Sequence, residues 1–459
     1  MAAGDGATAP TAYTGAVGEP ARRNVRGGPG ERDAGVAAGV AAHPGLAHAV
    51  ARRHYLIMRN LVSPSPHSTA AAHRALTAAR QRLAARDGRI VATQVALSEI
   101  AAPTGEEGAR GAWVARRFAE LGMADVRTDA AGNVIGRRPG AVGGAPVVIC
   151  AHLDTVFPRG TALHVRQERR RLVGPGIGDN GRGLAAMLAL AEEIDGVRVR
   201  TMRPVDFVAT VGEEGIGDLR GAKHLFATAA ETPAAAVALD GASDERIVHR
   251  ALGSRRYRVT FRGPGGHSWA AYGVPNAVHA AGIATAHLAA LPLPRTPRTT
   301  LSVGRVGGGI SVNAIPEEGW LEVDLRSTSP ATLARYDREV RAIARTAAEE
   351  ESARRGIGAP PLSYAVEVIG DRPCGEVPAD DPLVLASIEA TRLVGREPEL
   401  ATASTDANVP IGHGIPAVAI GAGGRGGDAH TPGEWFDNTD GTVGIARALT
   451  IVVAAAGIG

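Results

Sequence analysis

Three apolar runs of strand length, separated by helix-like segments, constrain the fold of this 459-residue chain. The runs cover residues 146–151, 205–211 and 235–239, and they lack the polar alternation of a strand with one wet face. Residues 181–194 and 219–229 lie between them and show helical periodicity. Strands that are buried on both faces and joined by helices form parallel sheets, because the helices cover both faces. The pattern therefore predicts an α/β domain with a mostly parallel sheet.

The segment ahead of the first run is predicted to belong to the same domain, which would start at residue 71. Residues 72–100 indicate one or two helices. Thr104 is the expected N-cap of a further helix, and Glu107, three residues later, would complete a capping box. Residues 124–128 and 133–137 then predict a strand, a turn and a second strand.

A different pattern occupies residues 248–360 and predicts a small inserted α+β domain of the ferredoxin-like kind. Its first strand alternates polar and apolar residues, as a strand with one wet face does. The expected elements are a strand, a helix, two strands and a long charged helix, at residues 255–262, 276–291, 301–306, 321–326 and 330–355. The α/β pattern returns over residues 361–459, so residues 71–247 and 361–459 would form one domain.

Residues 1–70 are rich in alanine, glycine, proline and arginine and show no sustained periodicity. Such a composition buries too little apolar surface to offset chain entropy, so we predict a disordered leader. Met58, within it, is an alternative start of translation. Arginine outnumbers Asp and Glu by 12 to 5 in residues 1–89, although the whole chain carries only +3. The basic pI of about 9.1 therefore comes from this end and predicts no nucleic-acid partner.

Other counts exclude further classes of protein. No apolar stretch approaches ~18 residues, so we expect no membrane-spanning helix and no membrane partner. Cys150 and Cys374 are the only cysteines, and two cysteines cannot form a disulfide framework. A reducing compartment suits this usage, so we predict a cytoplasmic protein.

Acidic and histidine side chains stand where predicted strands end or helices begin. They are His152 and Asp154, Asp179, Glu213 and Glu214, and Asp240. The carboxyl ends of parallel strands, ~4.8 Å apart, meet at one edge of a sheet, so these side chains should converge. Carboxylates held so close together repel one another, and divalent cations would remove that conflict.

The donor set matches a pair of metal ions. Three carboxylates and two imidazoles, the second from His430, are nitrogen and oxygen ligands of the kind that zinc accepts in hydrolytic sites. Two ions ~3.5–4 Å apart and bridged by a carboxylate are a common hydrolytic arrangement. Cobalt and manganese accept similar ligands, so the sequence leaves the metal open.

Spacing within the clusters suggests roles. His152 and Asp154 are two residues apart at a strand end, so they point to the same side. Asp154 is then expected to accept a hydrogen bond from the imidazole and orient it. Glu213 and Glu214 are adjacent and point in different directions. One can bind metal while the other accepts a proton from water that the metal activates.

Seven short segments carry a family resemblance: Ala151-His152-Leu153-Asp154-Thr155-Val156, Gly178-Asp179-Asn180-Gly181, Gly212-Glu213-Glu214-Gly215, Leu239-Asp240-Gly241, Gly265-Gly266-His267-Ser268, Thr405-Asp406-Ala407 and Asp428-Ala429-His430-Thr431-Pro432. Over residues 85–459 the chain resembles the co-catalytic zinc metallopeptidase family M-twenty. That family includes aminoacylases, carboxypeptidases, peptidase T and succinyl-diaminopimelate desuccinylase. The resemblance implies a zinc-hydrolase catalytic domain whose insertion serves as a lid and dimerisation domain.

The resemblance implies a role for each candidate ligand. Asp179 would bridge two zinc ions. His152 and Asp240 would complete the shell of one ion, and Glu214 and His430 the shell of the other. Aspartate rather than histidine at position 240 favours peptidases and deacylases over ureido or carbamoyl hydrolases.

The resemblance also implies roles around the metals. Glu213 would be the general base and would later pass its proton to the leaving amine. His267 would reach the site of a partner subunit in a homodimer and stabilise the oxyanion there. Asn313 and Arg326 would hold substrate carboxylate or carbonyl groups, and the arginine fork suits both oxygens of a carboxylate.

These roles predict a two-metal hydrolase that cleaves a peptide or N-acyl amide bond of a small substrate, as an exopeptidase or a deacylase. Three alternatives stay open at this point. The chain could be a non-catalytic binding protein on the same scaffold. It could hydrolyse an amide of another type, such as a ureido or carbamoyl group, or it could be a two-metal phosphohydrolase.

Overall fold

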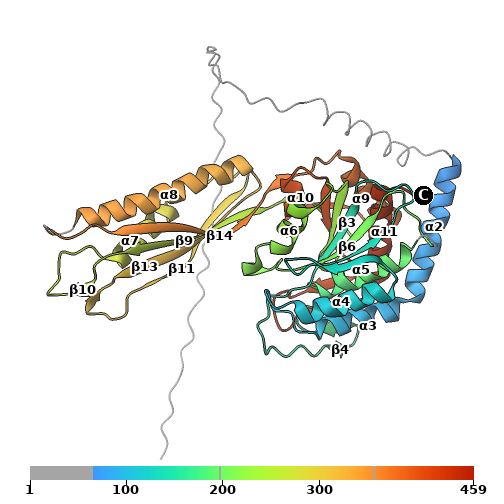
Figure 1. The fold of residues 1–459 in the computed structure, drawn as a ribbon, viewed down its shortest axis with the longest axis horizontal. Helices are drawn as coiled ribbons and strands as arrows, with labels where there is room; N and C mark the ends of the chain where they lie inside the picture. Colours follow the sequence, from blue (N-terminus) through green and yellow to red (C-terminus); the bar gives the residue numbers. More distant parts are fainter. Residues whose placement is uncertain (1–65, 196–197, 355, 357, 459) are drawn as a thin grey trace, which may run out of the picture. The chain divides into compact units, whose positions relative to one another are not determined.

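The computed structural model describes residues 66–195, 198–354, 356 and 358–458. Most of the predicted leader, including Met58, lies outside these residues. Helix α2 (Pro66–Ala85) begins five residues ahead of the expected start at residue 71 and is followed by α3 (Asp87–Ser98). In this part of the chain, helices and a large sheet form an α/β domain, and a second sheet with two helices forms an inserted domain (Figure 1).

The large sheet confirms the predicted, mostly parallel α/β architecture. Its strand order among the described residues is β1 (Ala124–Thr128), β2 (Val134–Arg138), β6 (Val205–Thr210), β3 (Val147–His152), β7 (Ala235–Leu239), β17 (Ala417–Ile420), β8 (Arg246–Ala251) and β15 (Gly375–Glu376). Strand β16 (Glu399–Ala403) also pairs with β8, in parallel. Strands β6, β3, β7 and β17 run parallel. The pairings of β1 with β2, β2 with β6, β8 with β17 and β15 with β8 are antiparallel.

The parallel strands are buried along their whole length because helices cover them. Helices α5 (Gly181–Glu193) and α11 (Gly441–Ala456) contact β3. Helices α2, α3 and α9 (Pro382–Leu393) pack against these two, and α4 (Gly108–Glu120) packs on β1 and β2. Every residue of β3, β6, β7 and β17 is buried, which explains why these strands appear as continuous apolar runs in the sequence.

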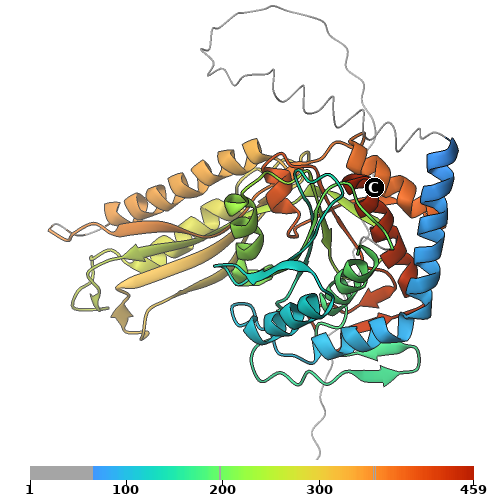
Figure 2. The same cartoon turned by 45° about the vertical axis from the view of Figure 1, so that its right-hand side comes forward.

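The inserted domain has an antiparallel sheet in the order β11 (Thr299–Gly308), β13 (Glu318–Ser327), β9 (Gly253–Arg262) and β14 (Ser363–Arg372). Helices α7 (Ala277–Ala289) and α8 (Pro330–Ala353) pack against one face (Figures 1 and 2). Burial alternates along β13, with Leu321, Val323 and Leu325 in the core beneath the helices. The opposite face, which carries Asp324 and Arg326, is only partly buried.

Both predicted boundaries of the insertion need correction. Strand β8 belongs to the large sheet, so the insertion begins at β9 rather than at residue 248. Strand β14 pairs with β9 from Ser363 to Arg372, so the insertion ends near residue 372 rather than at 360. Most side chains of β14 are exposed, so the strand lacks the apolar alternation that would have revealed it.

Shorter elements were not predicted. They are helix α10 (Asn408–Gly412), the two-stranded pair β10 (Gly266–His267) and β12 (Ala314–Ile315), and the small sheet of β18 (Arg425–Gly427), β19 (Trp435–Asp437), β5 (Arg171–Val173) and β4 (Arg166–Glu168). Helix α6 (Arg220–Thr228) was predicted, over the slightly longer residues 219–229. Among the described residues, every helix is too short or too polar to cross a membrane.

Candidate metal centre and active site

The carboxyl ends of three neighbouring strands deliver four of the candidate side chains. His152 is the last residue of β3, Glu213 and Glu214 follow β6, and Asp240 follows β7. Strand β3 pairs in parallel with both β6 and β7, so these strand ends lie side by side at one edge of the sheet. The sheet order therefore produces the convergence that the sequence predicts.

Asp179 connects two imidazoles that are distant in sequence. Its Oδ1 lies 2.9 Å from Nε2 of His152, and its Oδ2 lies 3.1 Å from Nε2 of His430. Burial alone would raise the pKa of Asp179, but the hydrogen bonds to both imidazoles lower it far below the ordinary value. One carboxylate thus presents a separate oxygen to each histidine, as a bridging ligand would.

Candidate ligand atoms form three overlapping groups. Within each group all atoms lie within 4.8 Å of one another, and the groups are His152, Asp179 and Asp240; Asp179, Glu214 and His430; and His152, Glu213 and Glu214. The first two groups share Asp179. The five side chains that the family resemblance implies around two cations are therefore brought together, and the third group also places Glu214 near His152.

The electrostatics of the cluster fit divalent cations. Burial, followed by the charge of Asp179, raises the pKa of both Glu214 and Asp240 above the ordinary value. Burial also raises the pKa of Glu213 well above its ordinary value. Carboxylates packed this closely are costly to ionise without a counter-charge. The donors are carboxylate oxygens and imidazole nitrogens, which suit zinc, cobalt and manganese alike.

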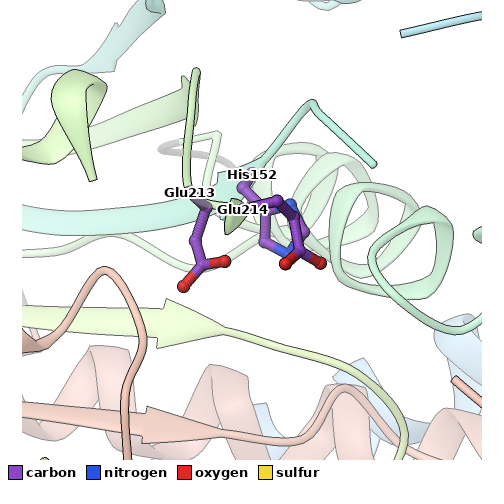
Figure 3. Close-up of side chains that lie close together, drawn as sticks. All are labelled: His152, Glu213 and Glu214. Atoms are coloured by element: carbon purple, nitrogen blue, oxygen red, sulfur yellow. The ribbon is translucent and has the colours of Figure 1, made fainter. Parts of the chain in front are cut away.

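Glu213 and Glu214 are adjacent but lie differently. Their carboxylates point in different directions (Figure 3), although an oxygen of each lies within 4.8 Å of a His152 ring nitrogen. Oε1 of Glu214 is 2.9 Å from Nε2 of His430. Both glutamates are buried, at 6% and 7% exposure respectively. Among the described residues Glu214 also groups with Asp179 and His430, whereas Glu213 does not, so Glu213 is the glutamate available for a role other than metal binding.

Asp154 organises the backbone of this glutamate pair. Its Oδ1 accepts the N–H of Glu213 at 2.9 Å, and its Oδ2 accepts the N–H of Glu214 at 3.0 Å. Nδ1 of His152 lies 3.0 Å from the Asp154 backbone oxygen but 3.7 Å from its carboxylate. The nearer group that orients the imidazole is therefore the carbonyl rather than the expected carboxylate. Burial raises the pKa of Asp154, but the contacts to His152 and the two backbone N–H groups lower it to about 2.

The predicted capping box of Thr104 and Glu107 is wrong. The Thr104 hydroxyl donates to Oδ2 of Asp154 at 2.8 Å, and the N-cap position of α4 is Glu107. The Glu107 carboxylate accepts the N–H of Gly212 at 3.1 Å and pairs with Arg220. Thr104 therefore contacts Asp154 and Glu107 contacts the segment that carries Glu213, instead of the two side chains capping the helix.

Asn180 connects the loops of two candidate ligands. It caps α5 by accepting the N–H of Gly183 at 3.0 Å, which places Asp179 directly before the helix. Its Nδ2 donates to the carbonyl of Leu239 at 2.8 Å, next to Asp240. A Cβ at position 183 would lie 2.0 Å from Oδ1 of Asn180, so only glycine fits at this position.

Glu434 is a site residue that the sequence reasoning missed. Its buried carboxylate accepts the N–H groups of Gly176 at 2.9 Å, Gly178 at 2.7 Å and Asp179 at 2.7 Å. Burial raises its pKa to about 7, against the lowering effect of these backbone hydrogen bonds. Glu434 stands four residues after His430 in the sequence, but this spacing does not indicate which backbone groups its carboxylate contacts.

A cavity of about 340 Å³ opens over the cluster. Three arginines also line it: Arg256 from β9, Arg326 from β13 and Arg372 from β14, all in the inserted domain. Nε of Arg326 donates to Asp324 at 2.6 Å, and Nε of Arg256 reaches the same carboxylate at 3.4 Å. The predicted substrate ligand Arg326 therefore faces the candidate metal centre, and Arg256 and Arg372 were missed.

His267 and Asn313 lie elsewhere on the inserted domain. His267 stands opposite Ala314 in the pairing of β10 with β12, and the N–H of Ser268 donates to the Asn313 carbonyl at 2.9 Å. Both His267 and Asn313 are exposed. Neither belongs to the cavity lining of its own chain among the described residues, so the structure groups these two with each other rather than with the five candidate ligands.

Residues 148–454 match Peptidase family M20/M25/M40, and this stretch contains all five candidate metal ligands. The chain belongs to this family. Family membership confirms the resemblance seen in the sequence and makes the protein a hydrolase of the metal-dependent peptidase and amidohydrolase kind.

Individual proteins similar to this chain support the same fold. The chain is 28% identical over 328 residues to the uncharacterized protein YqjE of Bacillus subtilis (strain 168), covering 67% of this chain and 83% of that protein. The aminopeptidase PepT of Bacillus cereus superposes with a TM-score of 0.65 at 24% identity, over 81% of this chain and 99% of PepT. The YXEP protein of Bacillus subtilis, described as a dinuclear metal binding peptidase, gives a TM-score of 0.60 at 17% identity, over 81% and 99%.

Proposed function

We propose that this protein is a two-metal hydrolase that cleaves a peptide or N-acyl amide bond of a small substrate, with Glu213 as the general base. One observation carries the proposal. The two oxygens of Asp179 face His152 and His430 separately, Asp240 lies with His152, and Oε1 of Glu214 is 2.9 Å from Nε2 of His430.

The residues fit two divalent ions, for which zinc is the first choice. His152, Asp179 and Asp240 would hold one ion, and Asp179, Glu214 and His430 the other. Ions bound there would polarise the amide carbonyl and lower the pKa of water. No cysteine belongs to the ligand groups of the described residues, so cobalt and manganese fit the same donors.

Glu213 is suited to proton transfer. Its carboxylate lines the cavity, and its backbone is fixed by Asp154. It would accept a proton from the attacking water and give it to the departing nitrogen. Burial of the side chain excludes bulk water, which strengthens its electrostatic contact with the reacting groups.

The arginines favour a substrate with a free carboxylate. Arg326 and Arg256 share the single carboxylate of Asp324, so these three side chains together carry a net positive charge on the inserted-domain side of the cavity. Within the described residues, Arg326 uses only Nε in hydrogen bonding, so its terminal nitrogens remain available for a substrate. A bidentate contact with both oxygens of a substrate carboxylate would use them. Short peptides and N-acyl amino acids both carry such a group.

The inserted domain is proposed to act as a lid and to form a homodimer. His267 and Asn313 are exposed beside each other, which supports a role for both in the active site of a partner subunit. In that arrangement His267 would stabilise the oxyanion and Asn313 would bind the substrate.

A hydrolysis screen tests the proposal. The purified protein, loaded with zinc, is incubated with dipeptides, tripeptides, N-acyl amino acids, N-carbamoyl amino acids and a phosphodiester, and the products are identified by mass spectrometry. We expect release of an amino acid from a peptide or an N-acyl amino acid. Turnover of only the carbamoyl compounds or the phosphodiester would replace the proposed substrate class. Absence of any turnover, with two metals bound, would indicate a binding protein.

A further inference from the structure

Arg372 is the last residue of β14 and therefore the last residue of the inserted sheet. Its side chain is buried, at 7% exposure, and lies against groups from the catalytic domain. Nη2 donates to the backbone carbonyl of Glu213. Nη1 lies 3.4 Å from Oε1 of Glu213 and 3.2 Å from the Ser404 hydroxyl. One guanidinium group thus contacts both the main chain and the carboxylate of the proposed base.

The third nitrogen of Arg372 also faces the catalytic domain. Nε lies 3.9 Å from Oδ1 of Asp218, and neither of these two buried atoms has a hydrogen-bond partner among the described residues. Glu213, Ser404 and Asp218 therefore surround the guanidinium group. Arg326 differs, because its terminal nitrogens have no such contacts in the described part of the chain. The surroundings of Arg372 suit a role toward the protein rather than toward a substrate.

We infer that Arg372 is a positioning residue that fixes the orientation of the Glu213 carboxylate, an inference that rests on the proposed function. Asp154 holds the N–H of Glu213, and Arg372 holds its carbonyl and its Oε1. With the backbone fixed on both sides, few side-chain rotamers keep the carboxylate near the guanidinium. Without Arg372, the Glu213 carboxylate would be free to turn toward the metal ligands beside it.

The chemistry of arginine suits this task. A planar guanidinium donates through several nitrogens in a fixed geometry, so it can contact two oxygens of one residue together. Hydrogen bonds from a charged donor are also shorter and stronger than neutral ones. Lysine would supply a single charged nitrogen and could reach only one of the two oxygens. The inference also explains why a residue of the inserted domain is buried beside the base.

The test compares the Arg372→Gln and Arg372→Lys variants with the wild type on the substrate that the screen finds to be hydrolysed fastest. We expect kcat to fall by ~10–100-fold with KM changed by less than ~3-fold, and metal content to stay at the wild-type level. Lysine should recover only part of kcat. Arg255→Gln is the control, because Arg255 pairs with Asp371 and does not line the cavity, and its kcat should match the wild type.

A double variant separates positioning from other roles. If Arg372 acts through Glu213, then Glu213→Gln combined with Arg372→Gln should be no slower than Glu213→Gln alone. A double variant whose kcat falls by the product of the two single effects would overturn the inference. So would single Arg372 variants with an unchanged kcat, whether or not KM is raised. If Arg372→Gln fails to fold, Arg372→Lys enters the same comparison. Normal turnover by Glu213→Gln would overturn the role of Glu213 as the base. If Glu213→Gln loses turnover but the Arg372 variants turn over normally, only the inference about Arg372 is overturned.

Discussion

The Glu434 carboxylate accepts the backbone N–H of Asp179 at 2.7 Å, although the two residues are 255 positions apart in the sequence. Glu434 lies four residues after His430, so this contact ties the loop of one candidate ligand to the loop of another. The same carboxylate also binds the N–H groups of Gly176 and Gly178. The geometry of the candidate bridging ligand therefore depends on a side chain that binds no metal itself.

Replacing Glu434 with glutamine should weaken metal binding. The amide keeps the volume but offers only one acceptor oxygen, so its NH₂ group would face at least one backbone N–H. We expect metal affinity to fall by ~10–100-fold, measured by competition with a coloured chelator. Glu389→Gln is the matched control, because Glu389 is exposed and pairs only with Arg392 among the described residues. Wild-type affinity in Glu434→Gln would show that the loop holds its shape without this carboxylate.

Replacing Glu213 with glutamine should separate binding from catalysis. The variant keeps the shape of the side chain but cannot accept a proton. We expect wild-type metal content and thermal stability, with kcat lower by ~10²–10⁴-fold in steady-state assays. Near-normal turnover would remove Glu213 from the role of general base. Loss of metal instead would assign it to the ligands.

Removal of metal should reduce both activity and stability. Without cations, the buried carboxylates near Asp179 repel one another. The folded protein then also loses the free energy of stabilisation that metal binding supplies. At a metal concentration of about 100 times Kd that stabilisation is ~2.7 kcal/mol. Thermal unfolding before and after dialysis against a chelator measures it, and zinc, cobalt or manganese should restore both properties. An unchanged melting temperature, with full activity in the chelator, would exclude a metal centre.

Mixing two inactive variants tests the action of His267 across subunits. A heterodimer of His267→Ala and Glu213→Gln contains one site with both residues intact. Random exchange of subunits should therefore recover roughly a quarter of the wild-type sites. Activity is followed after the two proteins are unfolded and refolded together, with each variant refolded alone as the control. A mixture no more active than its parts would argue against a shared site.

The sequence allowed the prediction of those parts of the fold that depend on local pattern. Strands β3, β6 and β7 are buried on both faces, so their continuous apolar runs were recognisable. Most candidate ligands were recognisable for the same reason, because they end or follow such a run or precede a helix, whereas His430 lies in a loop between β18 and β19. Strand β14 was missed, since most of its side chains are exposed and its pairing with β9 is set by tertiary structure.

Contacts between distant segments were beyond the reach of local patterns. Arg372 and Glu434 each bind a backbone group that lies 159 or more residues away. Thr104 was expected at a helix N-cap, but Asp154 competes for its hydroxyl. In these cases contacts within the site determine the local structure, because buried carboxylates and carbonyls need hydrogen-bond donors, and these donors come from distant parts of the chain.

The most direct test of the account is a crystal structure of the zinc-loaded protein with anomalous scattering recorded above and below the zinc absorption edge. We expect two zinc peaks, one on each side of Asp179. One should lie beside His152 and Asp240, and the other beside Glu214 and His430. A single peak, or two peaks that Asp179 does not bridge, would contradict the proposed metal centre.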